Sequence, residues 1–287
     1  MNVVEFKNVK KARGEFKLDI PELAIKQGYI TGFIGQNGAG KTTTIKLIMD
    51  LLKVDAGSIE IFGKDIKKHT AKLKDQIGFV GDPTGYTAES TIKDIKAMFS
   101  PFYSTWDEAL FHKYIKRFDL DTNKKVKELS QGQNKQLALT MALARRPKLI
   151  ILDEPTANLD PIVRNYILSV LMEHMQDEEV SVFYSTHITS DLDKASDYIV
   201  YIQDGKILFN EERELLSQKY YKVKGPNRIL ENNMKGQLIG CTQSSFGFEA
   251  LTDNKQKAYG LFGSEAIYEK ASIEEIMIFL EEGKRNG

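Results

Sequence analysis

The chain has 287 residues, of which 41% are hydrophobic and 28% charged, a composition typical of a soluble globular protein. Lysine and arginine together number 40, as do aspartate and glutamate, so no overall charge favours nucleic acid or an anionic membrane as a partner. Cys241 is the single cysteine, which excludes an intrachain disulfide framework and suits a reducing compartment.

We expect neither a secretory leader nor a membrane-spanning segment. Residues 1–14 (MNVVEFKNVKKARG) lack an apolar stretch of leader length, and no run approaches the roughly 18 apolar residues of a membrane span. Any role at a membrane is therefore expected to depend on a partner chain. The sequence also lacks internal repeats and the long heptad-patterned insert of a coiled-coil ATPase.

The N-terminal region predicts strands that lead into a glycine-rich loop. VVEFKNV and FKLDI have β-branched and aromatic content typical of strands, and residues 29–34 (YITGFI) form a short apolar run. This run enters GQNGAGKT at 35–42, and the apolar residues of the following TTTIKLIMDLL recur at helical spacing. The glycine-rich stretch therefore lies between a predicted strand and a predicted helix.

GQNGAGKT fits the phosphate-binding pattern G-x-x-x-x-G-K-[ST]. Its glycines let successive backbone N–H groups converge on phosphate oxygens at the start of a helix. In this pattern Lys41 bridges the β- and γ-phosphates, and the Thr42 hydroxyl binds Mg²⁺. The alternative, a glycine-rich turn without a ligand, is disfavoured by the full spacing and the strand–loop–helix context. The predicted nucleotide contacts here are Gly35, Gln36, Asn37, Gly38, Ala39, Gly40, Lys41, Thr42 and Thr43.

The middle of the chain predicts a helical insertion within an α/β sheet. Residues from about 82 to 145 are rich in helical patterns and aromatic side chains. Strand-like sequence resumes at LIILD, VSVFYST and YIVYIQDGKILF, and the Asp204-Gly205 pair in the last is a strong hairpin signal. Strands that alternate with helices indicate a mostly parallel sheet with ligands at the carboxyl ends of its strands.

The C-terminal part predicts a small α+β appendage. It mixes a helical NEERELLSQKY, the strand-like YYKVKG and QLIGCTQ, and an amphipathic SIEEIMIFLEEG. The appendage is expected to start between 211 and 219. We place the boundary at 215, with domains at 1–215 and 216–287 and a helical subdomain at about 82–145.

Carboxylates follow the predicted strand LIILD. Asp153 is positioned to hold a metal through water, and Glu154 to polarise an attacking water. Apolar strands often end in acids, so this pair indicates a site only in combination with the phosphate loop. His187 follows another strand and therefore reaches the same edge of the sheet. A single histidine is usually structural, but at this edge a contact to the terminal phosphate is the favoured interpretation.

LSQGQ at 129–133 is a short polar turn directly before the helical run NKQLALTMALA. Such a turn usually serves as a helix cap. Five motifs occur in order, however: GQNGAGKT, LSQGQ, LIILDE, ANLD and STH. Over residues 1–210 they resemble the nucleotide-binding subunit of an ATP-binding-cassette (ABC) transporter.

This resemblance implies a phosphate-loop ABC cassette that binds ATP and Mg²⁺ and hydrolyses ATP. Its α/β fold has a mostly parallel sheet, an antiparallel N-terminal sub-sheet and a helical insertion. In the family, Asp153 binds the metal, Glu154 is the base and His187 contacts the γ-phosphate. The LSQGQ helix start binds a nucleotide held by another subunit, so two cassettes meet head to tail; its first family glycine is replaced by Gln131. The residues that the resemblance places at this dimer contact are Ser130, Gly132, Gln133 and Asp160.

Two positions depart from the family pattern. An aromatic residue usually stacks on adenine shortly before the phosphate loop; here Arg13 occupies that position, and a guanidinium plane can also stack. Phe16 is the alternative. A glutamine usually follows the strand IGFV, whereas here Asp82 stands in its place as an expected metal contact.

The resemblance extends to bacterial exporters whose polytopic membrane subunit is encoded separately. The chain is then expected at the cytoplasmic face of the cell membrane, paired with a second identical or different cassette and without nucleic acid. Exporters of amphipathic or antimicrobial peptides are most similar, and the exporter of phenol-soluble modulins is one example. A soluble ABC ATPase acting on ribosomes or DNA is the alternative, and a small-molecule kinase would leave LSQGQ and STH unexplained. The helical insertion also carries an aromatic cluster. We expect it either to line a docking groove for the membrane subunit or to form the insertion's own core. Its residues are Phe99, Phe102, Tyr103 and Trp106.

Overall fold

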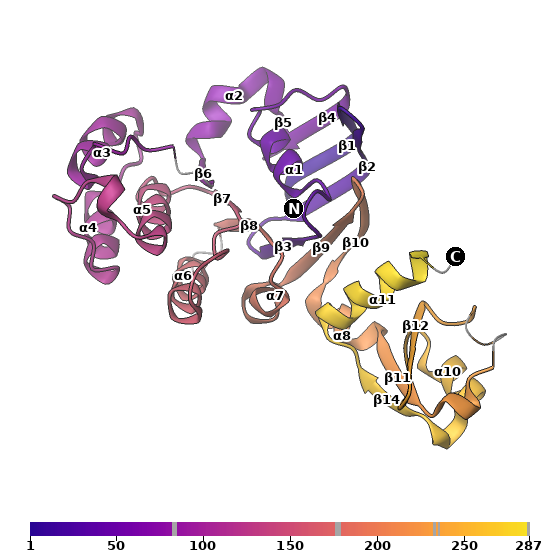
Figure 1. Cartoon of the computed structure of the whole chain (residues 1–287). Helices are drawn as coiled ribbons and strands as arrows, with labels where there is room; N and C mark the ends of the chain where they lie inside the picture. Colours follow the sequence, from indigo (N-terminus) through magenta and orange to yellow (C-terminus); the bar gives the residue numbers. More distant parts are fainter. Residues whose placement is uncertain (82–84, 176–178, 232–233, 235, 286–287) are drawn as a thin grey trace. The chain divides into compact units, whose positions relative to one another are not determined.

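The computed structural model describes residues 1–81, 85–175, 179–231, 234 and 236–285. The chain divides into two compact units, Met1–Asn210 and Glu211–Gly287 (Figure 1). The division falls slightly before the boundary of 215 that the sequence predicts. Each unit is described separately below.

The first unit begins with an antiparallel sheet of strand order β2-β1-β4-β5. Along β1 the side chains of Val4 and Phe6 are almost fully buried, and Lys7 is exposed. This alternation gives the sheet one apolar face, as a period of two residues requires. Val9 is buried again three residues after Phe6, where the pairing with β4 shifts register between Lys7 and Lys10. The expected antiparallel sub-sheet is thus confirmed. Its strands are β1 (Asn2–Arg13), β2 (Phe16–Lys26), β4 (Ala56–Ile61) and β5 (Lys64–Asp65).

The second sheet of this unit has the order β10-β9-β3-β8-β7-β6. Strand β3 pairs in parallel with β8 and β9, and β7 pairs in parallel with β6 and β8. Positive φ angles of 46° at Asp204 and 75° at Gly205 form the tight turn between β9 and β10. The prediction of a mostly parallel sheet is confirmed. Its strands are β3 (Ile30–Ile34), β6 (Ile77–Val80), β7 (Leu149–Asp153), β8 (Ser181–Thr186), β9 (Tyr198–Gln203) and β10 (Lys206–Glu212).

One buried apolar cluster joins the two sheets through helix α1 (Lys41–Ile48). Ile45 of α1 belongs to the same cluster as Ile59 of the antiparallel sheet and Phe33 and Ile151 of the parallel sheet. Burying each such side chain stabilises the folded state by roughly 1.5–3 kcal/mol. The loop that precedes α1 is therefore attached to the buried apolar cluster that the two sheets share.

A helical segment lies between β6 and β7 in the sequence. Its last helix, α5, packs on α4 and on β6. Figure 1 shows α3, α4 and α5 grouped together beside the sheet. Asp82 lies outside the described residues. The helices of the first unit, besides α1, are α2 (Ile66–Asp75), α3 (Ile92–Phe99), α4 (Glu108–Arg117), α5 (Gln131–Leu143), α6 (Pro161–His174) and α7 (Thr189–Ala195).

The second unit contains an antiparallel sheet of order β12-β13-β11-β14 with its own apolar cluster around Val223 and Phe248. This confirms the expected α+β appendage. In neither unit is any helix of the described ranges both long and apolar enough to cross a membrane. The elements of the second unit are α8 (Arg213–Lys219), β11 (Tyr221–Gly225), β12 (Gly240–Ser244), β13 (Gly247–Thr252), α10 (Lys255–Phe262), β14 (Ile267–Lys270) and α11 (Ile273–Arg285).

Candidate functional site

The loop between β3 and α1 passes so close to its neighbours that two of its glycines are required. A Cβ atom at Gly35 would lie 2.3 Å from the carbonyl oxygen of Ile202, and one at Gly40 would lie 3.0 Å from the Phe16 ring. Gly40 also has a φ of 116°, which L side chains rarely adopt. The close approach keeps the loop narrow at the start of α1, where backbone N–H groups and the helix dipole favour an anion.

Lys41, the first residue of α1, is folded over this loop. Its ammonium donates to the Gly35 carbonyl at 2.7 Å and lies 3.3 Å from a carboxylate oxygen of Glu154. Only 6% of the Lys41 side chain is exposed, so its positive charge is concentrated inside the loop. Phosphate oxygens bound at this loop would compete with these same acceptors for the ammonium protons.

The acidic residues at the end of β7 are held by the neighbouring strand β8. Ser185 Oγ donates to Asp153 Oδ1 at 2.6 Å and accepts from the Glu154 backbone N–H at 3.0 Å. Glu154 has a φ of 51°, an uncommon value for a residue other than glycine. The chain thus turns sharply after Asp153. Ser185 is the first residue of the STH motif, in which the sequence predicts a role only for His187.

His187, directly after β8, contacts the same glutamate. Its Nδ1 atom lies 2.8 Å from Glu154 Oε2. Glu154 is therefore placed between Lys41 on one side and His187 on the other. The structure brings these three predicted site residues together because β3, β7 and β8 are parallel neighbours whose carboxyl ends share one edge.

A cleft of about 680 Å³ opens along the phosphate loop. The hairpin between β1 and β2, where Arg13 pairs with Phe16, forms part of its wall. Both residues considered for adenine stacking thus line the cleft. The lining residues are Arg13, Gly14, Phe16, Gln36, Asn37, Gly38, Gly40, Lys41, Thr42, Thr43 and Glu154.

The LSQGQ stretch forms a helix cap at the start of α5. Ser130 Oγ accepts from the Gln133 N–H at 3.1 Å, and the Gln133 side chain accepts from the Ser130 N–H at 3.0 Å. Gly132 lies next to Val163 of α6, whose first turn is capped by Asp160. Residues 130–133 and Asp160 are therefore close to each other, and none of them lines the phosphate-loop cleft of the same chain.

Lys135, on the same helix, is a site residue that lies in none of the five motifs. Its ammonium donates to the carbonyl oxygens of Glu154 at 2.7 Å and Ala157 at 3.0 Å. The residue is only 5% exposed. A lysine inside the otherwise uncharged run NKQLALTMALA is the signal that could have indicated a buried, specific contact.

The oxygen donors near the phosphate loop could hold a hard cation such as Mg²⁺. Mg²⁺ typically takes one or two protein oxygens and completes its shell with phosphate and water. Thr42 supplies a hydroxyl on the cleft wall, and Asp153 supplies a carboxylate oriented by Ser185. Among the residues that the structure describes, no cluster of three or more histidine, cysteine, aspartate or glutamate side chains offers a complete metal cage.

The fold and this site define a phosphate-loop nucleotide hydrolase. The sequence profile of the ABC transporter family matches residues 18–157. The chain is 30% identical over 222 residues to the ABC transporter ATP-binding protein YtrB of Bacillus subtilis. This alignment covers 77% of this chain and 76% of YtrB. It is 31% identical over 209 residues to the bacitracin transport ATP-binding protein BcrA of Bacillus licheniformis, covering 72% of this chain and 68% of BcrA.

A solved structure, cbiO1 from Clostridium perfringens, part of the ABC transporter complex cbiONQ, is similar with a TM-score of 0.64 and 25% identity. The similarity covers 76% of this chain and 92% of cbiO1. The chain belongs to the ABC transporter family, as an ATP-binding subunit with ATP hydrolase activity.

Proposed function

We propose that this subunit drives export through a separately encoded polytopic membrane chain, to which it binds at the cytoplasmic face of the cell membrane. The placement of Glu154 between Lys41 and His187 is the observation that carries the catalytic part of the proposal. The relative named for bacitracin transport supports a peptide cargo of the amphipathic or antimicrobial class. Phenol-soluble modulins are one candidate within that class.

The residues at the sheet edge divide the work of ATP hydrolysis. The phosphate loop and Lys41 bind the phosphates, while Glu154 accepts a proton from the attacking water. His187, next to Glu154, orients that carboxylate and contacts the γ-phosphate. Thr42 and Asp153 hold Mg²⁺, which supplies charge neutralisation for the transferred phosphoryl group. Arg13 or Phe16 stacks on the adenine ring.

Two cassettes close head to tail around two ATP molecules. Ser130, Gly132 and Gln133 contact the nucleotide in the cleft of the other subunit, and Asp160 lies at the same contact. Their separation from the cleft of their own chain supports this arrangement. The start of α5 offers the positive end of a 13-residue helix to the phosphate.

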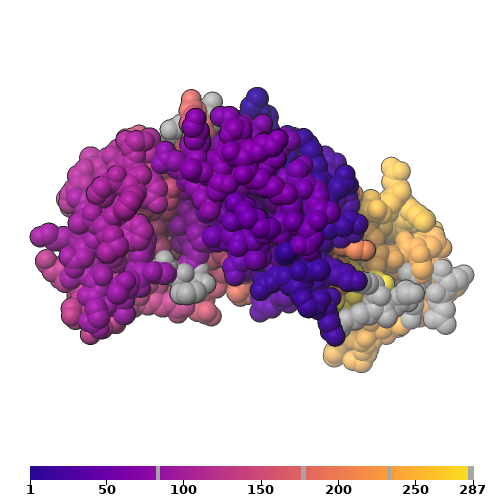
Figure 2. Space-filling view, turned by 90° about the horizontal axis from the view of Figure 1, so that it is seen from above, coloured from indigo at the N-terminus to yellow at the C-terminus, as the bar shows by residue number. Residues whose placement is uncertain are grey.

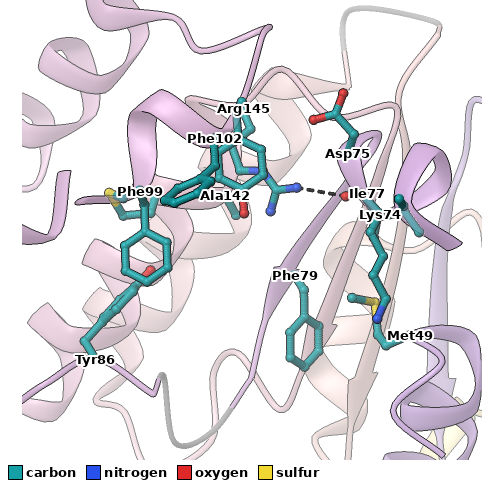
Figure 3. A pocket seen from close by; sticks show the side chains of 13 residues that line it. Met49, Lys74, Asp75, Ile77, Phe79, Tyr86, Phe99, Phe102, Ala142 and Arg145 are labelled. Carbon is teal, nitrogen blue, oxygen red and sulfur yellow. Dashed lines mark hydrogen bonds between the residues drawn. The ribbon is translucent and has the colours of Figure 1, made fainter. Parts of the chain in front are cut away.

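A second cleft, of about 410 Å³, lies between α1, α2 and β6 on one side and the helical segment on the other (Figure 2). Figure 3 shows Tyr86 and Phe99 on its helical side and Phe79 on the opposite side. We refer to this cleft as the docking groove. The membrane chain inserts a cytoplasmic helix here, because exposed aromatic surface of this kind favours a protein partner.

The aromatic cluster of the helical segment is divided between two environments. Phe99, Phe102 and Tyr103 line the docking groove, where the Arg145 guanidinium lies 3.6 Å from the centre of the Tyr103 ring. Trp106 is not among the groove residues and packs on Phe111, with ring centres 5.6 Å apart. The first three residues support the docking proposal, and Trp106 belongs to the segment's own packing.

Phe102 offers a direct test, because 78% of this residue is exposed and its replacement should leave the fold intact. We expect the wild-type chain to co-purify from detergent extracts with a polytopic membrane protein and Phe102→Glu to lose that protein. Phe246→Glu is the matched control, since Phe246 is 97% exposed and lies in the second unit. Retention of the membrane protein by Phe102→Glu would contradict docking in the groove. Recovery of ribosomal particles instead would support the soluble alternative.

A further inference from the structure

Lys135 connects the helix that starts at LSQGQ to the backbone of the catalytic glutamate. We propose that it is a positioning residue, which transmits the position of α5 to Glu154 and so couples the two nucleotide sites of the dimer. This inference rests on the proposed role of Glu154 as the base. No motif of the family resemblance described above includes Lys135.

The contacts of Lys135 are specific and well buried. The ammonium reaches two carbonyl oxygens of one short turn, those of Glu154 and Ala157, at 2.7 and 3.0 Å. The same turn is closed by a hydrogen bond from the Ala157 N–H to the Glu154 carbonyl at 3.3 Å. A buried ammonium without such acceptors is strongly disfavoured, so Lys135 holds the turn at a defined distance from α5.

Glu154 needs this support because its backbone conformation is unusual. With a φ of 51°, it is held at its N–H by Ser185, at its carbonyl by Lys135 and at its carboxylate by Lys41 and His187. These four side chains come from α1, from α5 and from the carboxyl end of β8. Movement of α5 therefore displaces the Glu154 peptide relative to the phosphate loop.

The position of Lys135 along α5 links the nucleotide contact at the start of the helix to Glu154. Ser130 caps α5, and Lys135 lies in the second turn of the same 13-residue helix. A helix transmits a displacement of its first turn to the next with little loss, because its backbone hydrogen bonds are continuous. In the proposed dimer, Ser130 contacts the nucleotide of one site, whereas Glu154 acts on the other. Through Lys135, binding of a nucleotide at one site of the dimer therefore changes the position of Glu154 at the other site.

The contacts of Lys135 also predict which substitutions separate coupling from stability. Lys135→Met removes the ammonium but keeps an apolar chain of similar length. Lys135→Arg keeps a cation able to donate to both carbonyls. Thr140→Val is the matched control on the same helix. Thr140 is fully buried, and its hydroxyl donates to the Gln136 carbonyl within α5 at 2.8 Å.

The experiment measures kcat, the ATP dissociation constant, the Hill coefficient for ATP and the melting temperature of the full chain. A misplacement of about 1 Å at a catalytic group lowers turnover by about 10²-fold. We expect Lys135→Met to lose kcat by up to this factor, with the ATP dissociation constant unchanged and the Hill coefficient reduced toward 1. Lys135→Arg should recover most of the turnover, and Thr140→Val should keep both kcat and the Hill coefficient.

A double substitution tests whether Lys135 acts through Glu154. Lys135→Met added to Glu154→Gln should cause no further loss of kcat, because residues that act as a unit are not additive. Full addition of the two losses, or wild-type kcat in Lys135→Met, would overturn the proposal. If Glu154→Gln itself keeps wild-type kcat, the base assignment fails instead. Should Lys135→Met not fold, equal kcat in Lys135→Arg, Lys135→Gln and wild type would also overturn the proposal.

Discussion

The hydroxyl of Ser185 contacts both acidic residues at the end of β7, Asp153 and Glu154. It donates to Asp153 and accepts from the backbone of Glu154, so it orients the proposed metal ligand and fixes the start of the turn that carries the base. Ser185 is fully buried, and no water can easily replace its hydroxyl. Groups that orient a metal ligand in this way usually matter almost as much as the ligand itself.

We predict that Ser185→Ala raises the Mg²⁺ concentration needed for half-maximal ATP hydrolysis by about 10–100-fold. Asp153 would lose the Ser185 hydroxyl that donates to its Oδ1 atom and fixes the orientation of the carboxylate. Titrating MgCl₂ at saturating ATP measures the effect. Ser181→Ala is the control on the same strand, because Ser181 accepts from the Gly28 N–H at 2.9 Å, away from the site. An unchanged Mg²⁺ requirement in Ser185→Ala would show that Asp153 does not need this orientation.

The roles of the residues in the phosphate-loop pattern were predictable, and the contacts that side chains make across the fold were not. Lys41 and Thr42 belong to one eight-residue pattern whose spacing alone defines a phosphate loop. Ser185 and Lys135, in contrast, contact Glu154 from positions 31 and 19 residues away. Such contacts depend on strand order and helix packing, which the local sequence does not specify.

At the scale of elements, helices α4 and α6 are joined by a small ionic cluster. Glu173 of α6 accepts from Lys113 at 2.8 Å and from Arg117, both on α4. Tyr166 of α6 donates to the Arg117 carbonyl at 2.7 Å. The hydrogen bond from Lys113, and to a smaller extent that from Arg117, lowers the pKa of Glu173 from its usual 4.5 to about 2. The helical segment that carries LSQGQ is therefore connected to α6 by an interaction that requires an ionised carboxylate.

We predict that Glu173→Gln lowers the free energy of unfolding at pH 7 by roughly 0.5–1 kcal/mol, since the pair is partly solvent-exposed. A folded-state pKa below the unfolded value stabilises the protein above the unfolded pKa, and this contribution is lost as pH falls. The difference from wild type should therefore be constant above about pH 5.5 and shrink between about pH 4.5 and 2. Urea unfolding at several pH values measures it.

Glu89→Gln is the control for this experiment. Glu89 also pairs with two lysines, Lys125 and Lys127, but its side chain is 63% exposed against 36% for Glu173. Its replacement should change the free energy of unfolding less. A Glu173→Gln difference that stays constant down to pH 3 would show that the loss comes from packing and not from the carboxylate charge.

Element types were predicted more reliably than their partners. The apolar run at 149–153 and the helical spacing after the phosphate loop determine β7 and α1 locally, because burial on one or both faces leaves a clear pattern. The domain boundary was harder, since β10 (Lys206–Glu212) continues across the division after Asn210. A strand that crosses the division leaves no composition change to mark it.

At the scale of the whole molecule, each chain carries one phosphate loop and one LSQGQ helix start, which do not line a common cleft. A complete site therefore requires two chains in the proposed function. The second unit, Glu211–Gly287, carries none of the five motifs in its sequence. We propose that this unit either contacts the other cassette or regulates closure of the dimer.

We predict that Glu154→Gln binds ATP, hydrolyses it about 10²–10⁴-fold more slowly, and accumulates as an ATP-bound dimer. Size-exclusion chromatography with and without ATP·Mg²⁺ measures the change in apparent mass. Lys41→Ala is the control, because it should lose nucleotide affinity and remain monomeric. An elution volume of Glu154→Gln that ATP does not change, with ATP binding confirmed separately, would contradict the head-to-tail arrangement.

Under the proposed function, the β1–β2 hairpin that lines the phosphate-loop cleft contacts the base of the nucleotide. Arg13 and Phe16 offer a guanidinium plane and a phenyl ring there, and both present flat surfaces to a base. Every purine has a face that can stack on such surfaces, so stacking alone separates adenine from guanine poorly. The phosphate loop, in contrast, binds the phosphates through several backbone N–H groups and through Lys41. Under the proposed function, selectivity is therefore strong for a triphosphate and weak for the base, and the abundance of ATP in the cell decides which purine nucleotide is used.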